Sequence, residues 1–293
     1  KARPHALLNN EPLAELLKTL VQLDRLPGLI ADGHLQALAV TASSYTTGEH
    51  ITFYRSQESR PPWIRSQRRA VSTDITHGHL LASSAIPFIF PARLVPVGGQ
   101  LHYLGDGSMR QTAPIAPAIH LGAERILVVG AGRMHEPQAQ LLSNVEPTYP
   151  SLAQIGGHAL SSIFLDALSV DIERAERINQ TLSLIPVDAR ARSSLRPLNL
   201  LVLSPSQRID EIASRHIREL PGPIRTLLGA VGVKEPSAEQ TGTGAAGGAA
   251  LASYLLFETG FTQELIELGR TDVQAQRDEI CAFFGWTLPA QSH

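Results

Sequence analysis

Short apolar runs alternate with amphipathic helical segments along most of the chain, and this alternation restricts the fold class more than any other feature of the sequence. The runs are rich in Val, Ile, Leu, Thr and Ala, and turn residues such as glycine separate them, as is typical of strands. The expected strands are residues 35–41, 50–55, 93–96, 101–104, 126–129 and 198–203. Strands that alternate with helices indicate a layered α/β fold.

Helical segments are indicated by apolar periodicity together with start and stop residues. Pro12 suits the first turn of a helix, Ser151 can cap another, and Gly122 suits the end of a third. The expected helices are residues 12–23, 76–85, 115–121, 151–182, 209–220, 224–231 and 250–284. Gly98-Gly99 predicts a hairpin turn, and residues 235–250, rich in Gly, Ala, Ser and Thr, predict a loop.

The charge and the cysteine content exclude several classes of protein. A net charge of −2 provides no long-range attraction to nucleic acid. The one cysteine excludes an intramolecular disulfide and an all-cysteine zinc site, and no histidine pattern of a metalloenzyme occurs. No apolar run approaches the length of a membrane span. We therefore expect a cytoplasmic protein that needs no metal or other cofactor and binds no nucleic acid.

Asp106 stands between Gly105 and Gly107, directly after an expected strand. Asp and Gly are ordinary turn residues, so the spacing by itself favours a tight turn. The arrangement also suits a catalytic carboxylate, because flanking glycines allow close approach to a reacting group and because loops at strand ends often carry function. On spacing alone, the turn remains the favoured interpretation of Asp106.

The segments around Asp106 follow one another in a recognisable order. ASSAIPFIFP at residues 82–91 is followed by the expected hairpin, by Asp106-Gly107-Ser108, and by PIAPAIHLGAERILVV at residues 114–129. This order resembles the patatin-like phospholipases, particularly a bacterial branch of that family. Ser108 stands where the family usually has Gly or Ala. ALLNNEPL at residues 6–13, AVTASSYTTG at residues 39–48 and parts of residues 250–266 extend the resemblance over nearly the whole chain.

The resemblance implies a three-layer α/β/α fold with a central, mostly parallel sheet and added C-terminal helices. Residues 1–142 would form the remainder of the catalytic domain, and residues 143–293 a mostly helical extension that packs on the same fold. The implied activity is hydrolysis of lipid acyl esters by a Ser–Asp dyad, with Asp106 as the general base in a motif completed by Gly107 and Ser108. The expected partners are a lipid or ester substrate and, peripherally, a membrane surface.

Two motifs of the family are missing from this chain. Family members begin with a glycine-rich turn that forms the oxyanion hole and a G-x-S-x-G nucleophile segment, and neither occurs here. The nucleophilic serine would then lie upstream of Lys1. We predict that this chain alone cannot hydrolyse esters. We also expect an N-terminal fragment to stay associated, because a sheet without its central strands exposes unpaired edges.

Two other functions are compatible with the sequence. The first is a non-catalytic binding or scaffold protein on a patatin-like fold. The second is a nucleotide- or nicotinamide-binding protein that uses Gly130 and Gly132, which follow the expected strand at 126–129. Its fingerprint is incomplete, because His135 stands where a third glycine is needed for close packing of helix and strand.

Overall fold

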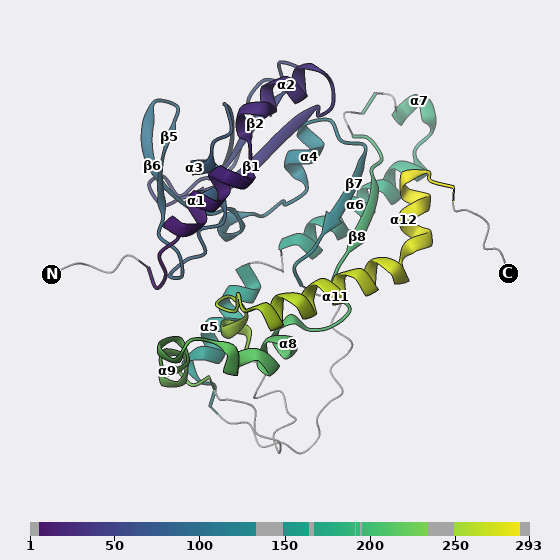
Figure 1. Ribbon diagram of the computed structural model, residues 1–293. Helices are drawn as coiled ribbons and strands as arrows, with labels where there is room; N and C mark the ends of the chain where they lie inside the picture. Colours follow the sequence, from purple (N-terminus) through teal and green to yellow (C-terminus); the bar gives the residue numbers. More distant parts are fainter. Residues whose placement is uncertain are drawn as a thin grey trace. The chain divides into compact units, whose positions relative to one another are not determined.

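The computed structural model describes residues 6–132, 149–163, 167–190, 192–193, 195–233 and 249–287. The chain divides into two compact units, Lys1–Ala123 and Glu124–His293 (Figure 1). The boundary expected after residue 142 lies outside the described residues. The structure is mixed α/β, as the alternation of strands and helices predicts.

The first unit is built on a six-stranded sheet in the order β3-β4-β2-β1-β6-β5. Its strands are β1 Ala37–Ser44, β2 His50–Ser56, β3 Ile64–Arg65, β4 Arg68–Ser72, β5 Arg93–Val97 and β6 Gln100–Asp106. The β2–β4 pair is parallel, and the other neighbouring pairs are antiparallel. The expected mostly parallel sheet is therefore wrong for this unit, whose sheet is mostly antiparallel.

The short connections between strands explain this difference. β1 and β2 are joined by residues 45–49, in which Gly48 has a φ of 72°, and β5 and β6 by Gly98 and Gly99, with φ of 58° and 86°. Two consecutive positive φ angles belong to the turn type whose twist matches a two-stranded hairpin. Parallel neighbours would need a crossover connection of about a dozen residues or more, which these turns cannot provide.

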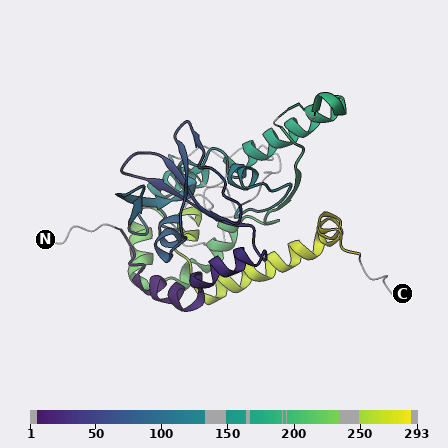
Figure 2. The ribbon, with the colours of Figure 1, turned by 90° about the horizontal axis from the view of Figure 1, so that it is seen from above.

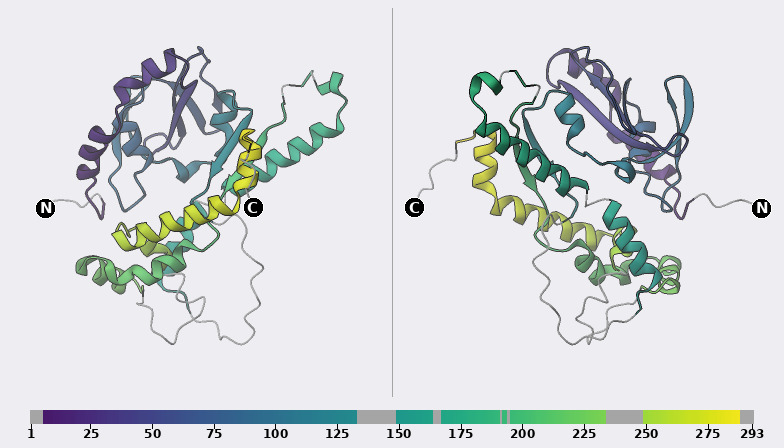
Figure 3. Two further views of the ribbon diagram at one scale, coloured as in Figure 1. Left: turned by 45° about the vertical axis from the view of Figure 1, so that its right-hand side comes forward. Right: turned by 180° about the vertical axis from the view of Figure 1, so that it is seen from behind.

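Helices pack around this sheet. They are α1 Glu11–Leu20, α2 Leu26–Ala31, α3 His77–Ser83 and α4 Ala116–His120, with short 3₁₀ helices η1 Leu23–Arg25 and η2 Gly107–Arg110. Figures 2 and 3 show α1 and α2 following one another along one side of the unit. α3 packs against β1, β5 and β6, and the core includes Ile51, Phe53 and Leu104, all fully buried.

The helix signals of the first unit are confirmed where they can be compared. Pro12 lies in the first turn of α1, where its missing N–H costs no hydrogen bond. Gly122, with a φ of 101°, follows the end of α4. α3 ends at Ser83 rather than at residue 85, so it stops before Pro87 is reached.

The second unit joins a two-stranded sheet to a set of helices. β7 Arg125–Val129 and β8 Asn199–Leu203 pair in parallel, and the long stretch between them supplies the required crossover. The helices are α5 Leu152–Ser161, α6 Ala167–Leu184, α7 Val187–Arg190, α8 Ile209–His216, α9 Gly222–Ala230, α11 Thr259–Ala275 and α12 Arg277–Phe284, with 3₁₀ helix η4 Ile217–Glu219. Figure 3 shows α11 and α12 (yellow) meeting at an angle, and α11 also packs on α8.

The expected loop at residues 235–250 lies outside the described residues, apart from its last two, which begin a short helix at 249–253. The helix expected over residues 250–284 is interrupted, because residues 254–258 separate the short helix from α11. Within the described ranges, no helix combines the length and the apolar content needed to cross a membrane.

Candidate functional site

Asp106 is the last residue of β6 and lies at the point where three segments meet. In the sheet register Asp106 is opposite Ala42 of β1, and its backbone N–H donates to the carbonyl of Ala85, 3.0 Å away. Its carboxylate Oδ1 accepts a hydrogen bond from the Ser108 N–H at 2.8 Å, so Asp106 caps the 3₁₀ helix η2. The side chain is buried, with 7% of the residue exposed.

The two glycines that flank Asp106 have separate packing reasons. A Cβ on Gly105 would lie 2.6 Å from the Tyr45 ring, and one on Gly107 would lie 2.6 Å from the backbone carbonyl oxygen of Thr41. Both distances are shorter than any normal contact. The G-D-G sequence is therefore explained by close chain packing, which holds the carboxylate in one place between β1 and β6.

The surroundings of Asp106 favour its protonated form more than water does. Burial raises the pKa of Asp106 above its usual value, and the hydrogen bonds from Ser108 oppose this in part. Tyr45 lies near enough for the Asp106 charge to help burial raise the pKa of the tyrosine. His50 hydrogen-bonds to the backbone of Gly107, but burial lowers the pKa of His50 to about 4, so the ring is neutral at pH 7.

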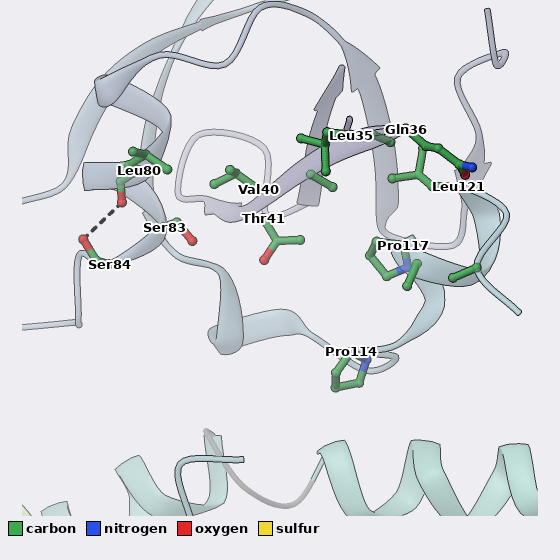
Figure 4. Close-up of a pocket in the computed structure, with 14 residues that line it drawn as sticks. Leu35, Gln36, Val40, Thr41, Leu80, Ser83, Ser84, Pro114, Pro117 and Leu121 are labelled. Carbon is green, nitrogen blue, oxygen red and sulfur yellow. Dashed lines mark hydrogen bonds between the residues drawn. The ribbon is translucent and has the colours of Figure 1, made fainter. Parts of the chain in front are cut away.

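An apolar cavity of about 710 Å³ lies beside this point (Figure 4). It is lined by residues of β1, α3 and α4 and of the segments next to them, namely Leu35, Gln36, Ala37, Ala39, Val40, Thr41, Leu80, Ser83, Ser84, Pro114, Pro117, Ala118, Leu121 and Ala123. Figure 4 shows the Thr41 side chain directed into the cavity between Ser83 and Pro117. Asp106 does not line it, but the strand and loop partners of Asp106, Ala42 and Ala85, directly follow lining residues.

A buried serine–histidine pair lies nearby that the sequence did not indicate. Ser44 Oγ lies 3.1 Å from His102 Nδ1, and both residues are at most 3% exposed. The Ser44 hydroxyl also accepts a hydrogen bond from the Thr47 N–H at 3.1 Å. A substrate carbonyl cannot reach a hydroxyl enclosed in this way, so the pair stabilises the turn between β1 and β2. The spacing of a serine and a histidine along the sequence does not show whether the two form a structural pair or a catalytic one.

The described structure gives little support to the other candidate sites. Gly130 follows β7, and its N–H donates to the Leu203 carbonyl at 2.8 Å, so Gly130 extends the β7–β8 pairing. Neither Gly130 nor Gly132 has a positive φ, and the helix that would hold a pyrophosphate falls after residue 132, where residues 133–148 are not described. The described part of the chain contains no group of His, Cys, Asp and Glu side chains that could hold a metal ion.

The site is thus a buried carboxylate at a strand end, held by close glycine packing, next to an apolar cavity. Such a combination of a positioned polar group and an apolar cavity is typical of ligand sites. Comparison with known proteins adds no family to this description, since no family model, no curated protein and no solved structure matches the chain.

Proposed function

We propose that this chain supplies the general base and the acyl-binding cavity of a serine hydrolase that acts on lipid or other carboxylic esters. The observation that carries the proposal is the position of Asp106, a buried carboxylate of raised pKa at a strand end beside an apolar cavity of about 710 Å³. The resemblance of residues 82–129 to patatin-like phospholipases supports the same role, together with a patatin-like fold.

Each part of the site has a chemical task in this reaction. Asp106 accepts the serine proton while the serine oxygen attacks the ester carbonyl, and the proton then passes to the departing alcohol as the ester C–O bond breaks. Asp106 then removes a proton from a water molecule whose oxygen attacks the acyl-serine carbonyl. It returns this proton to the serine oxygen as the bond between the acyl group and serine breaks and the acid leaves. A raised pKa makes Asp106 a stronger base than an exposed aspartate, and the cavity shields the acyl chain from water.

The serine comes from a segment outside these residues, because the chain contains no G-x-S-x-G sequence. Ser108 also hydrogen-bonds to Asp106, but its N–H and hydroxyl hold the carboxylate at the start of η2. The absence of a nucleophile is equally compatible with a non-catalytic binding protein that uses the cavity alone. Labelling of the serine separates these two functions.

The test uses the product of the complete gene that encodes this chain, with p-nitrophenyl butyrate as substrate and a fluorophosphonate as active-site label. The Asp106→Asn variant keeps the acceptor for the Ser108 N–H, so the fold should remain and kcat should fall by about 10²–10⁴-fold. Asp74→Asn is the matched control, since the Asp74 side chain is 77% exposed and its ion pair with Arg55, at 3.4 Å, lies at the surface.

Hydrolysis that survives Asp106→Asn would refute the proposal. So would the absence of any fluorophosphonate-labelled serine in the complete product, which would instead favour the binding protein. The 293-residue chain prepared alone should take no label and should show no hydrolysis that depends on Asp106.

A further inference from the structure

Strand β1 lies in the interior of the sheet order, but one of its edges is only partly paired. It pairs with β2 from Ala37 to Ser43, whereas it pairs with β6 only from Ala42 to Ser44. Residues 37–41 therefore have a strand on one side and, within the described residues, no strand on the other. An interior strand with an open edge is unusual, because unpaired backbone groups readily accept another strand.

The hydrogen-bond alternation shows which backbone groups face the open edge. The Gln57 N–H donates to the Gln36 carbonyl and the Ser44 N–H to the Glu49 carbonyl, each at 2.8 Å. In an antiparallel pair every second residue bonds to the same neighbour, so the even-numbered residues of β1 bond to β2. Ala37 and Ala39 consequently direct their N–H and C=O groups to the other side, where the described structure gives them no hydrogen-bond partner.

The apolar cavity of about 710 Å³ lies along this open edge. Consecutive residues of β1, from Ala39 to Thr41, line it. Consecutive strand residues point to opposite faces of a sheet, so only a cavity at the strand edge touches all of them. Figure 4 shows Leu80 and Ser83 toward one end of the lined part of β1 and Leu121 toward the other.

We propose that an extended peptide segment adds to the open edge of β1 as a parallel strand and fills this cavity. The free N–H and C=O groups of Ala37 and Ala39 would pair with the backbone of the incoming strand. Gly107 packs on the Thr41 carbonyl, so the open stretch is residues 37–40. Four residues lie within the usual range of strand lengths. None of the lining residues is charged, so the incoming strand carries small or apolar side chains, because a buried charge without a partner is costly.

The parallel direction rests on the proposed function. β1 runs from Ala37 toward Ala42, which is opposite Asp106. A parallel strand would therefore have its carboxyl end beside Asp106. A nucleophilic serine stands at the turn that follows a strand in G-x-S-x-G hydrolases, so a strand in this direction would deliver the serine next to its base.

The test uses a synthetic peptide as the probe, added to the full 293-residue chain. The peptide alternates Val and Ala over about seven residues, the length of a typical strand, and has a lysine at each end for solubility. A generic sequence suffices because main-chain hydrogen bonds provide most of the affinity in strand addition. The control peptide has the same side chains but is N-methylated at alternate residues, which removes the N–H groups of one edge.

The readout is amide hydrogen exchange followed by NMR. In the free chain the Ala39 amide should exchange fast and the Val40 amide, which bonds to β2, slowly. At millimolar probe, Ala39 exchange should slow by about tenfold or more, and the N-methylated peptide should have little effect. A nitroxide on the carboxyl end of the probe should broaden the Ala42 signal more than the Gln36 signal.

Variants complete the test. Ala37→Pro and Ala39→Pro each remove one open-edge N–H without touching the β2 ladder. Exchange is then followed at the Ala39 amide in the first variant and at the Ala37 amide in the second. Each variant should lose the protection, so that one serves if the other fails to fold. The proposal would be overturned by slow Ala39 exchange in the free chain, by no protection at saturating probe, by equal protection with the N-methylated peptide, or by stronger broadening at Gln36. Asp106→Asn should leave the protection unchanged, so failure of the proposed hydrolysis is distinguishable from failure of strand addition.

Discussion

Replacing Gly107 by alanine should destabilise the first unit strongly, because the added methyl group would overlap with Thr41. A Cβ at this position would lie 2.5 Å from Thr41 Oγ1, 2.6 Å from Thr41 O and 2.8 Å from Thr41 C. The hydroxyl can rotate away, but the carbonyl belongs to β1 and is held by the sheet. A normal contact would require a shift of about 0.8 Å in that backbone. We expect a loss of about 3 kcal/mol, the upper end of the usual cost of overpacking.

Two matched substitutions show whether packing is the cause. Gly105→Ala also meets a short contact, 2.6 Å, but with the half-exposed Tyr45 ring, which can turn outward. Its cost should be about 1 kcal/mol. Gly28→Ala in the exposed part of α2 meets no atom within 4 Å and should stabilise the unit by up to about 1 kcal/mol, the usual helix preference of alanine over glycine.

Urea unfolding followed by tryptophan fluorescence measures these changes. Trp63 stacks on His120 within the first unit, at 4.6 Å between ring centroids, and a Trp286→Phe background removes the other tryptophan. With a slope of about 2 kcal/mol per molar urea, the midpoint should fall by about 1.5 M for Gly107→Ala. A Gly107→Ala protein as stable as its parent would show that Thr41 and Gly107 do not pack as described, and the position assigned to Asp106 would be refuted with it.

Two further predictions concern the second unit. Ser151 Oγ accepts a hydrogen bond from the Gln154 N–H at 3.2 Å, and the Gln154 side chain accepts one from the Ser151 N–H at 2.7 Å. Ser151→Ala should therefore lower the free energy of unfolding in urea by about 1 kcal/mol, whereas Ser214→Ala inside α8 should change it little. Equal losses of stability in the two variants would contradict the cap. His216 lies between Glu264 at 2.7 Å and Glu219 at 2.6 Å, and the hydrogen bond to Glu264 chiefly raises its pKa above 6.5. Because this raised pKa belongs to the folded state, the stabilisation is complete below pH 6.5 and is lost as the pH rises through the pKa of the folded protein. The free energy of unfolding should therefore exceed that of His216→Gln by less at pH 9 than at pH 6. An unchanged difference between the two proteins would show that His216 is not charged beside Glu264 and Glu219.

The local elements were predictable from the sequence because their signals are local. Gly98 and Gly99 predict a tight hairpin, and both have the positive φ that such a turn needs. Ser151 predicts a cap, and its hydroxyl accepts the expected bond. These signals depend on neighbouring residues, so the remainder of the fold does not alter them.

The direction of strand pairing could not be predicted in the same way. The apolar content of residues 35–41 indicates a buried strand, but it does not identify the neighbours. The parallel expectation came from the resemblance, and the short β1–β2 and β5–β6 turns make those pairs antiparallel. β4 has two arginines at its start and only one buried residue, Ala70. Its sequence therefore contains no apolar run that would predict a strand beside β2.

The candidate site was predictable only in part. The assignment of Asp106 came from the resemblance, because its flanking glycines by themselves favour only a turn. The structure shows Asp106 buried at the end of β6. The reason for those glycines depends on Tyr45 and Thr41, about 60 residues away along the chain. The cavity is lined by three segments that are distant in the sequence. The residue pattern of one segment does not predict how closely it packs on another.

The direction of β1 relates the position of Asp106 to the direction of any strand that adds to the open edge. A strand rises about 3.3 Å per residue, so Ala37 and Ala42, the ends of the relevant stretch, lie about 16 Å apart. A nucleophile carried at the end of an antiparallel strand would be left near Ala37, far beyond hydrogen-bond reach of Asp106, which is opposite Ala42. A general base must lie within about 3 Å of the proton that it removes, or act through one water. The open edge can therefore serve an ester hydrolase only if the incoming strand runs parallel to β1, whereas a binding protein could accept either direction.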